Sequence, residues 1–176
     1  MLQSQREKTT SPYIIVKVSR IHNKGVYARM FIPAGIKIIE YMGEKISKAE
    51  SQRRAEIPLG RHKKNNKNGA VYIFDLNKKQ DIDGDVPYNT ARFINHSCEP
   101  NCEAEIIRGH IWISSIKDIQ VGEEITYNYG YDFDEYEEHR CNCGSTRCVG
   151  YILDRKYWPR LKRRQRREQE NLAVAV

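Results

Sequence analysis

Residues Ala91–Cys102 read ARFINHSCEPNC, a polar stretch in the second half of the chain that decides how the rest is interpreted. Asparagine, serine and proline at this density predict a tight turn, and taken alone the stretch indicates nothing more. It also holds a histidine and two cysteines, which are residue types that bind metal ions. Its meaning therefore depends on segments farther along the chain.

Two downstream segments change the interpretation. Residues 122–130 read GEEITYNYG, and because side chains alternate along a strand, Tyr127 and Tyr129 fall on one face. Residues 141–150 read CNCGSTRCVG and place three thiols in a tight turn. The chain has five cysteines, and an odd number with no secretory signal argues against a disulfide framework. The clustered thiols therefore indicate a metal site.

Together with NKGVYA at 23–28 and EYMG at 40–43, these segments resemble the motifs of the SET family of protein lysine methyltransferases and its post-SET zinc motif, in order and in spacing. The resemblance covers roughly residues 13–153. One departure is Asn23, where the family usually has glycine. Asparagine tolerates left-handed backbone conformations better than most residues, so we expect this loop to keep its shape.

The resemblance implies a predominantly β fold with a minor α+β component, built of small sheets around a pseudoknot and completed by a zinc-bound post-SET segment. We expect a flexible lead at residues 1–12, the SET domain at 13–133, the post-SET zinc segment at 134–153 and a basic, partly helical tail at 154–176. Ordinary topology rules disfavour the threading of a pseudoknot, so that feature rests on the resemblance alone. No cysteine precedes Cys98, so we do not expect the cysteine-rich pre-SET region of several histone H3 methyltransferases.

The activity that the resemblance implies is methyl transfer from S-adenosylmethionine to a lysine side chain of a protein or peptide, with histone tails among the substrates. Tyr129 takes the place of the catalytic tyrosine, and Tyr41 is expected to orient the amine. Tyr127 stands where the family varies between Phe and Tyr. A hydroxyl there leaves less room for a methylated amine, so we expect mainly monomethylation. We expect Tyr72 and Tyr131 to be ordinary half-buried core rings.

The resemblance also assigns seven cofactor-binding residues, which are Lys24, Gly25, Val26, Arg92, Asn95, His96 and Leu153. The first three are expected to present backbone groups to the methionine end. Asn95 is expected to hydrogen-bond the amino-acid portion, and His96 to meet adenine through its backbone rather than as an acid, a base or a metal ligand. Leu153 is expected to pack on adenine.

The proposed zinc site needs four ligands in a tetrahedron, with Zn–S distances of about 2.3 Å. Cys141, Cys143 and Cys148 supply three of them, and the resemblance implies Cys98 as the fourth. Cys102 is the alternative fourth ligand, although we interpret it as a small buried residue. The other alternative is a set of free core thiols without metal. A metal in this position would tie the C-terminal segment over the cofactor without taking part in the chemistry.

Local patterns elsewhere predict short strands and two helices. Ser47-Lys48-Ala49-Glu50 is a capping box that begins a helix ending near Ile57, because Pro58 and Gly60 follow. The next residues, RHKKNNKNG, predict an exposed loop. A second helix is predicted to begin at Pro159 and to fray at its far end. Arg108-Gly109-His110 predicts a hairpin turn between the last two of five strands, which are Tyr13–Val18, Ile36–Tyr41, Val71–Leu76, Glu103–Ile107 and Ile111–Ile116.

The net charge of +7 is unevenly distributed. Eight Lys or Arg residues lie between Asp154 and Glu168, whereas Asp132–Glu138 holds five acids and no base. The basic tail is either a solvated segment or a contact for nucleic acid or another partner. The acidic run either borders a groove for a basic peptide or forms a solvated loop.

Hydropathy and the lack of a signal peptide indicate where in the cell the protein acts. No apolar run approaches the roughly 18 residues of a membrane span, so we expect an intracellular monomer that does not enter membranes. In a eukaryote it would act in the nucleus on chromatin, and in a microbe in the cytoplasm. Two competing functions stay open: a catalytically silent zinc- and peptide-binding module, and a basic nucleic-acid-binding protein acting through Arg155–Arg167. The second would bind in a salt-sensitive manner without turnover.

Overall fold

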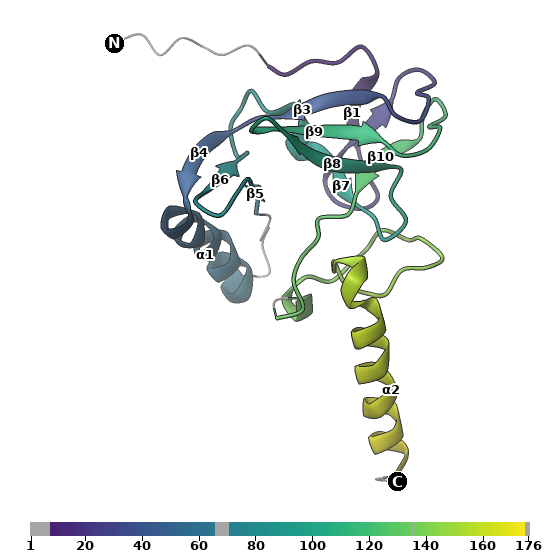
Figure 1. Cartoon of the computed structure of the whole chain (residues 1–176). Coiled ribbons are helices and arrows are strands. Elements are labelled where there is room, and N and C mark those ends of the chain that lie inside the picture. The colour runs from purple at the N-terminus through teal and green to yellow at the C-terminus, as the bar shows by residue number, and fades with distance from the viewer. Residues whose placement is uncertain (1–7, 66–70, 135, 175–176) are drawn as a thin grey trace.

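The computed structural model describes residues 8–65, 71–134 and 136–174, without the side chains of residues 57–65 (Figure 1). Its body consists of three small β-sheets, as expected. Residues 1–7 of the expected flexible lead lie outside the described part. At its described end Thr9 is held in place, because its hydroxyl accepts a hydrogen bond from the Thr90 backbone N–H at 2.9 Å. Within the described residues, no helix is long and apolar enough to cross a membrane.

The first sheet joins three distant parts of the chain. Its strand order is β1-β2-β10-β7, with β1 at Ile14–Val18, β2 at Lys24–Ala28, β10 at Glu124–Tyr127 and β7 at Asn95–His96. The short strand β7 runs parallel to β10, with Asn95 opposite Thr126 and His96 opposite Tyr127. This pairing brings the ARFINHSCEPNC stretch beside the GEEITYNYG segment. The pseudoknot threading itself stays a prediction.

The second sheet contains the predicted hairpin. Its order is β3-β9-β8, with β3 at Lys37–Tyr41, β9 at His110–Ser115 and β8 at Cys102–Ile107. The turn residues Arg108 and Gly109 have φ angles of 51° and 80°, which is the left-handed pair that a two-residue type I′ hairpin requires. The predicted strands therefore exist, with ends shifted by one residue.

The third sheet, in the order β4-β6-β5, lies beside the first helix. Its strands are β4 at Glu44–Ser47, β6 at Gln80–Asp83 and β5 at Ile73–Asp75. Helix α1 spans Lys48–Asn65, and its residue Arg54 pairs with Glu44 of β4 and Asp83 of β6, at 2.7 and 2.6 Å. These ion pairs attach the helix to the sheet.

Two expectations about α1 need correction. The Ser47 hydroxyl accepts from the Glu50 backbone N–H at 3.3 Å, but the Glu50 carboxylate accepts from Arg53 and Arg54, so only half of the capping box is formed. The predicted end at Ile57 is wrong, because the helix continues through Pro58 to Asn65. The fixed φ of proline fits a helix, and the residue removes only one backbone hydrogen bond. Residues 61–65 of the predicted loop are therefore helical, which corrects that part of the prediction, and residues 66–69 lie outside the described part.

The described residues form two apolar cores. The main core fills the space between the sheets and is rich in isoleucine, with Ile32, Ile111, Ile113 and Ile125 all fully buried. A second, smaller core lies in the C-terminal part and is made of Phe133, Tyr136, Leu153 and Leu161. The isoleucine content suits the strands, since β-branched side chains pack well on pleated surfaces.

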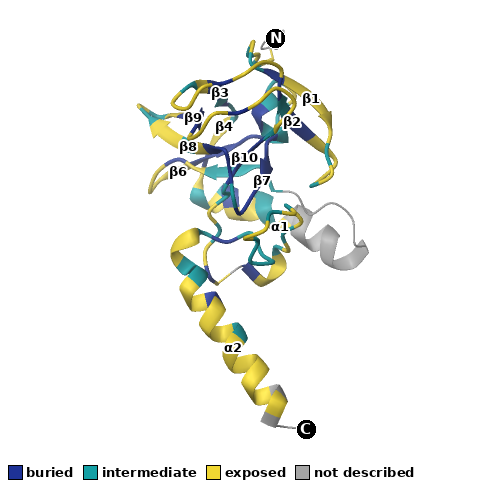
Figure 2. Cartoon of the chain, turned by 90° about the vertical axis from the view of Figure 1, so that its right-hand side faces the viewer, coloured by how far each residue is buried: buried dark blue, intermediate teal, exposed yellow. Residues whose placement is uncertain are grey.

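The C-terminal part consists of short turns followed by a long helix. The 3-10 turns are η2 at Tyr136–Glu138 and η3 at Arg155–Tyr157, and a third, η1, lies earlier at Thr90–Phe93. Helix α2 spans Trp158–Val174 and projects away from the sheets, almost entirely exposed (Figures 1 and 2). It begins one residue before the predicted Pro159. Because Leu161 is buried in the second core, the first turn of the tail belongs to the C-terminal part rather than to solvent.

Candidate active site and metal centre

A cavity of about 990 Å³ lies where the first sheet, β5 and the C-terminal segment meet. The C-terminal segment, by which we mean residues 131–153, contributes Tyr131, His139, Asn142 and Ile152 to the wall of this cavity. Seven of the predicted catalytic and cofactor-binding residues also line it, namely Lys24, Tyr41, Arg92, Asn95, His96, Tyr127 and Tyr129. Residues that are scattered over a hundred positions of sequence are thus brought to one site.

Aromatic rings form the inner end of the cavity. The ring centroids of Tyr127 and Tyr129 are 5.0 Å apart, Phe74 lies 6.2 Å from Tyr127, and Tyr41 lies 5.6 Å from Phe74. Tyr41 and Tyr127 are only 3% and 7% exposed. The arrangement gathers several buried aromatic rings and their hydroxyl groups on one part of the cavity wall, called here the aromatic end.

The hydroxyl groups of this aromatic end are held by backbone carbonyls. The Tyr129 hydroxyl donates to the Ile94 carbonyl at 2.9 Å, and the Tyr41 hydroxyl donates to the Tyr72 carbonyl at 2.7 Å. Burial raises the pKa of Tyr41, Tyr127 and Tyr129 well above the ordinary value of 10. All three therefore stay neutral at physiological pH, and the hydroxyl oxygens keep lone pairs for other donors.

Tyr72 and Tyr131 differ from expectation. Both are half-buried, but they line the cavity rather than serving only as core rings. Tyr131 stacks on His139 with ring centroids 4.0 Å apart and parallel planes. Their place follows from contacts between the body and the C-terminal segment, which no local pattern in the sequence records.

Asn95 is oriented by two acceptors. Its Nδ2 atom donates to the Lys24 carbonyl at 3.0 Å and to Glu124 Oε1 at 2.7 Å. A carbonyl and a carboxylate can only accept, so the amide nitrogen must face them. Among the described residues, Oδ1 is thus left as an acceptor for another donor. Glu124 also accepts from Ser19 and from Tyr27. The sequence motif contains Glu124, but its spacing does not reveal this organising role.

The loop before β2 has the backbone that was expected of it. Asn23 has a φ angle of 38°, which lies in the left-handed region that asparagine tolerates. A Cβ atom at Gly25 would lie 2.3 Å from Glu124 Oε1, so glycine is required there. Gly25 and the fully buried Val26 stand behind the cavity wall rather than in it.

Leu153 does not lie in the cavity wall. Its side chain is completely buried in the second core, and its neighbour Ile152 lines the cavity instead. Arg92 is in the wall, where its Nη1 pairs with Asp85 at 2.8 Å. The buried Nε of Arg92 has no hydrogen-bond partner among the described residues, and an acceptor on a bound ligand would satisfy it.

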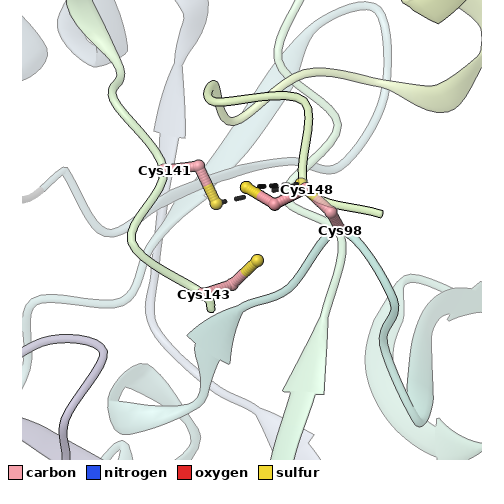
Figure 3. A group of neighbouring side chains, drawn as sticks. All are labelled: Cys98, Cys141, Cys143 and Cys148. Carbon is pink, nitrogen blue, oxygen red and sulfur yellow. Dashed lines mark hydrogen bonds between the residues drawn. The ribbon is translucent and has the colours of Figure 1, made fainter. Parts of the chain in front are cut away.

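Four cysteines meet at one point (Figure 3), and one of them, Cys141, is also part of the cavity wall. The sulfur atoms of Cys98, Cys141, Cys143 and Cys148 all lie within 4.8 Å of one another, and Cys98 Sγ is 3.8 Å from those of Cys141 and Cys148. A tetrahedron with Zn–S bonds of about 2.3 Å has sulfur–sulfur edges of about 3.8 Å. The four thiols therefore fit one tetrahedral metal ion.

The surroundings of Cys98 differ from those of Cys102, the fifth cysteine. The hydrogen bond with Cys141, together with a contact to His96, lowers the pKa of Cys98 to about 3, and thiolates are the form that binds metal. Cys102 lies in the main core instead, 1% exposed, where burial raises the pKa of its thiol to about 12. Cys98 is the fourth member, and Cys102 is a small buried residue.

Two acids of the acidic run contact the basic tail, and a third, Glu138, lies in the cavity wall. Asp132 accepts from the Tyr157 hydroxyl at 2.7 Å, and Glu137 pairs with Arg164 at 2.6 Å. On the other side, Arg155 donates to the backbone carbonyl of Cys98 at 2.9 Å. The first part of the tail thus attaches the C-terminal segment to the body, and these two acids are not free to border a peptide groove.

The mostly β domain, its tyrosine-lined cavity and the neighbouring four-cysteine cluster agree with the SET family that the sequence motifs resemble. The SET domain family model matches residues 23–130, and the chain belongs to this family. It is 37% identical over 155 residues to "Histone-lysine N-methyltransferase, H3 lysine-4 specific" of Saccharomyces cerevisiae, covering 85% of this chain. It is 36% identical over 150 residues to "Histone-lysine N-methyltransferase trithorax" of Drosophila virilis, covering 83% of this chain. The chain spans only 14% and 4% of the lengths of these two relatives.

Proposed function

We propose that the chain transfers a methyl group from S-adenosylmethionine to the side-chain amine of a lysine in a protein, with histones as the substrate class. The observation that carries this proposal is a cavity that is lined both by buried, neutral tyrosines and by the polar residues Lys24, Arg92 and Asn95. The names of the relatives support the histone assignment. A histone substrate would place the protein in the nucleus on chromatin, whereas a microbial enzyme would act in the cytoplasm.

The first chemical obstacle is the charge of the substrate amine. A free lysine with a pKa of about 10.4 is neutral in roughly one molecule in a few thousand at pH 7. Burial among Tyr41, Tyr127 and Tyr129 disfavours the ammonium form and lowers the pKa of the amine. Because these phenols are themselves neutral, none of them serves as a tyrosinate base. We therefore expect the rate to rise with pH as the amine deprotonates.

The transfer itself is an in-line displacement. The amine nitrogen forms a bond to the methyl carbon while the sulfur–methyl bond breaks, and the products are a methylated lysine, S-adenosylhomocysteine and a proton released to solvent. The protein contributes mainly alignment of the reacting atoms. The Tyr129 hydroxyl, fixed by the Ile94 carbonyl, keeps an oxygen lone pair toward the reacting centre, and Tyr41, fixed by the Tyr72 carbonyl, orients the amine.

Cofactor binding follows from the polar groups of the cavity. The free Oδ1 of Asn95 suits the ammonium group of the methionine portion, and the unpartnered Nε of Arg92 suits a carboxylate. Backbone groups of Lys24, Gly25 and Val26 would serve the same end of the molecule, and the His96 backbone would meet adenine. For Leu153 we propose an indirect role, in which its burial holds Ile152 at the cavity wall.

The proposed metal is one structural zinc ion held by Cys98, Cys141, Cys143 and Cys148. Four thiolates leave no open position for substrate, which is typical of structural rather than catalytic zinc sites. Cys141 and Asn142 are part of the cavity wall. Metal binding would therefore keep the wall in place and affect activity without contacting the methyl group.

The experiment that tests the enzyme proposal is transfer of labelled methyl from S-adenosylmethionine to core histones and to whole-cell lysate, with the methylated residues identified by mass. Tyr129→Phe removes one fixed hydroxyl and should lower kcat by about 100-fold. Tyr136→Phe in the second core is the matched control and should retain activity. Zinc-loaded wild-type protein that transfers no label to any of these proteins would instead favour a silent zinc- and peptide-binding module.

A second proposal concerns nucleic acid as a partner of helix α2. Lys162, Arg163, Arg166 and Arg167 are exposed on this projecting helix and have no ion-pair partner among the described residues. Changing all four to glutamine should weaken binding to duplex DNA and flatten the dependence of binding on salt. Unchanged affinity and salt dependence would leave the helix as a solvated segment. Methylation of a histone peptide should be unaffected by the change.

A further inference from the structure

The imidazole ring of His96 connects the cysteine cluster to the aromatic end of the cavity. His96 lies on β7 and is 3% exposed. Its Nδ1 accepts a hydrogen bond from the Tyr129 backbone N–H at 3.2 Å, and its Nε2 lies 3.6 Å from Cys98 Sγ. The ring also packs edge-on against the Tyr129 ring, with centroids 5.5 Å apart. One buried side chain thus contacts both a thiol of the metal centre and the predicted catalytic tyrosine.

The two contacts determine where the ring proton resides. A backbone N–H can only donate, so Nδ1 must be the unprotonated nitrogen and Nε2 must carry the hydrogen. That hydrogen points at the sulfur of Cys98, and a thiolate accepts it more strongly than a thiol does. A protonated Nε2 cannot itself bind a metal ion, which agrees with a site made of four cysteines.

We propose that His96 is a positioning residue that makes the geometry of Tyr129 depend on the metal at Cys98. A thiolate at Cys98 holds the Nε2 hydrogen, and the ring held in this way holds the Tyr129 backbone through Nδ1. Without a metal ion the four sulfur atoms are no longer held together, and the ring and Tyr129 lose the restraint at Cys98. The inference rests on the proposed zinc site and methyltransferase function, but the connection can be measured without turnover.

Two substitutions separate the two halves of the connection. The amide of asparagine reaches about as far as Nδ1, so His96→Asn keeps a partner for the Tyr129 N–H but loses the donor to Cys98. The amide of glutamine reaches about as far as Nε2, so His96→Gln keeps that donor but loses the acceptor for Tyr129. His110→Gln is the matched control, since this exposed histidine on β9 pairs with Glu40, 2.6 Å away, and is outside the cavity wall.

The first readout is the metal centre itself, measured with cobalt in place of zinc. His96→Asn should shift the thiolate-to-cobalt charge-transfer absorption and weaken metal binding by about tenfold, the usual effect of losing an outer-shell hydrogen bond. His96→Gln should have metal affinity within about threefold of wild type, as should His110→Gln. A wild-type spectrum and affinity in His96→Asn would overturn the proposal, whatever the activity.

The second readout follows the Tyr129 amide in a ¹⁵N-correlated spectrum while zinc is exchanged for cadmium. The exchange changes the charge on the thiolates without emptying the site. In wild type the Tyr129 resonance should move, whereas the Ile113 resonance in the main core should stay. In His96→Asn the movement at Tyr129 should be reduced at least twofold, and an undiminished movement would overturn the proposal.

In an active preparation, both variants should lower kcat more than they raise KM, and a wild-type kcat in His96→Gln would likewise contradict the proposal.

Discussion

The body and the C-terminal segment of this protein form the same cavity but are stabilised in different ways. Seventeen described residues make up the buried apolar core of the body, whereas four make up that of the C-terminal part. A core of four side chains cannot offset the conformational entropy of the segment that it orders. The proposed metal at the four cysteines, together with the ion pairs of the tail, would compensate for this deficit. Small units commonly depend on a metal in this way.

Because the body and the C-terminal segment are stabilised differently, they contribute differently to the site. The rigid body carries Tyr41, Tyr127 and Tyr129, which need fixed geometry, while the C-terminal segment closes the cavity with Tyr131 and Ile152. A wall that depends on a metal can be lost without unfolding the rest. The predictions below test whether the two parts fail separately.

The largest expected effect is that of removing the metal. Cys141→Ser, or chelation of the wild type, should abolish zinc binding and lower activity by at least about 100-fold, because the wall and the link to the body are lost. The β-sheet signal in circular dichroism should persist, because the main core is intact. Cys102→Ala is the matched control and should still bind one zinc ion. Loss of the sheet signal together with zinc would show that the two parts are not independent.

The second prediction perturbs the body alone. A Cβ atom at Gly84 would lie 2.3 Å from the Tyr41 hydroxyl, so Gly84→Ala must displace the ring that orients the amine. We expect activity to fall about tenfold, as expected for a misplaced catalytic group, with zinc content unchanged. Gly109→Ala, at the hairpin tip, strains a φ of 80° but meets no atom within 4 Å. It should cost stability and leave activity intact. Equal activities of the two variants would contradict the expected role of Tyr41.

Much of the site could be predicted from the sequence because its residues lie in motifs of fixed spacing. Tyr127 at the end of β10, Tyr129 just after it, Asn95 and the four cysteines are found where the motifs indicated. The left-handed Asn23 was also predictable, because few other residues adopt that conformation easily. These features depend on residue type and local geometry, which the sequence states directly.

What could not be predicted depends on contacts between distant segments. Packing across the fold determines three features that no local pattern reveals. Glu124 orients Asn95, the rings of Tyr72 and Tyr131 line the cavity, and Leu161 is buried. The extent of α1 was missed for a related reason: Pro58 is a local signal to end a helix, and attachment of α1 to its sheet through Arg54 overrides that signal.

The third prediction compares the two cores directly. Leu161→Ala empties a site that is 1% exposed in the second core, and should destabilise the C-terminal part by about 3 kcal/mol. Ile113→Ala is its counterpart in the main core, where the residue is completely buried. Hydrogen exchange should show faster opening of residues 136–161 alone in the first variant, and of all three sheets in the second. Faster exchange of β9 in Leu161→Ala would mean that the two cores unfold as one.

The smallest expected change in rate comes with a change in product. Tyr127 is 7% exposed beside Tyr129, and Tyr127→Phe removes one oxygen from the space around the amine. The body should stay folded and zinc should stay bound, so kcat should change by less than about threefold. The extra room should allow a methylated amine to react again, and mass spectrometry of a histone peptide should show di- and trimethyl lysine where wild type gives mainly monomethyl lysine. Abundant trimethyl product from the wild type would refute the role of Tyr127. If Leu161→Ala caused the same shift in product, the C-terminal wall of the cavity, and not Tyr127, would determine the degree of methylation.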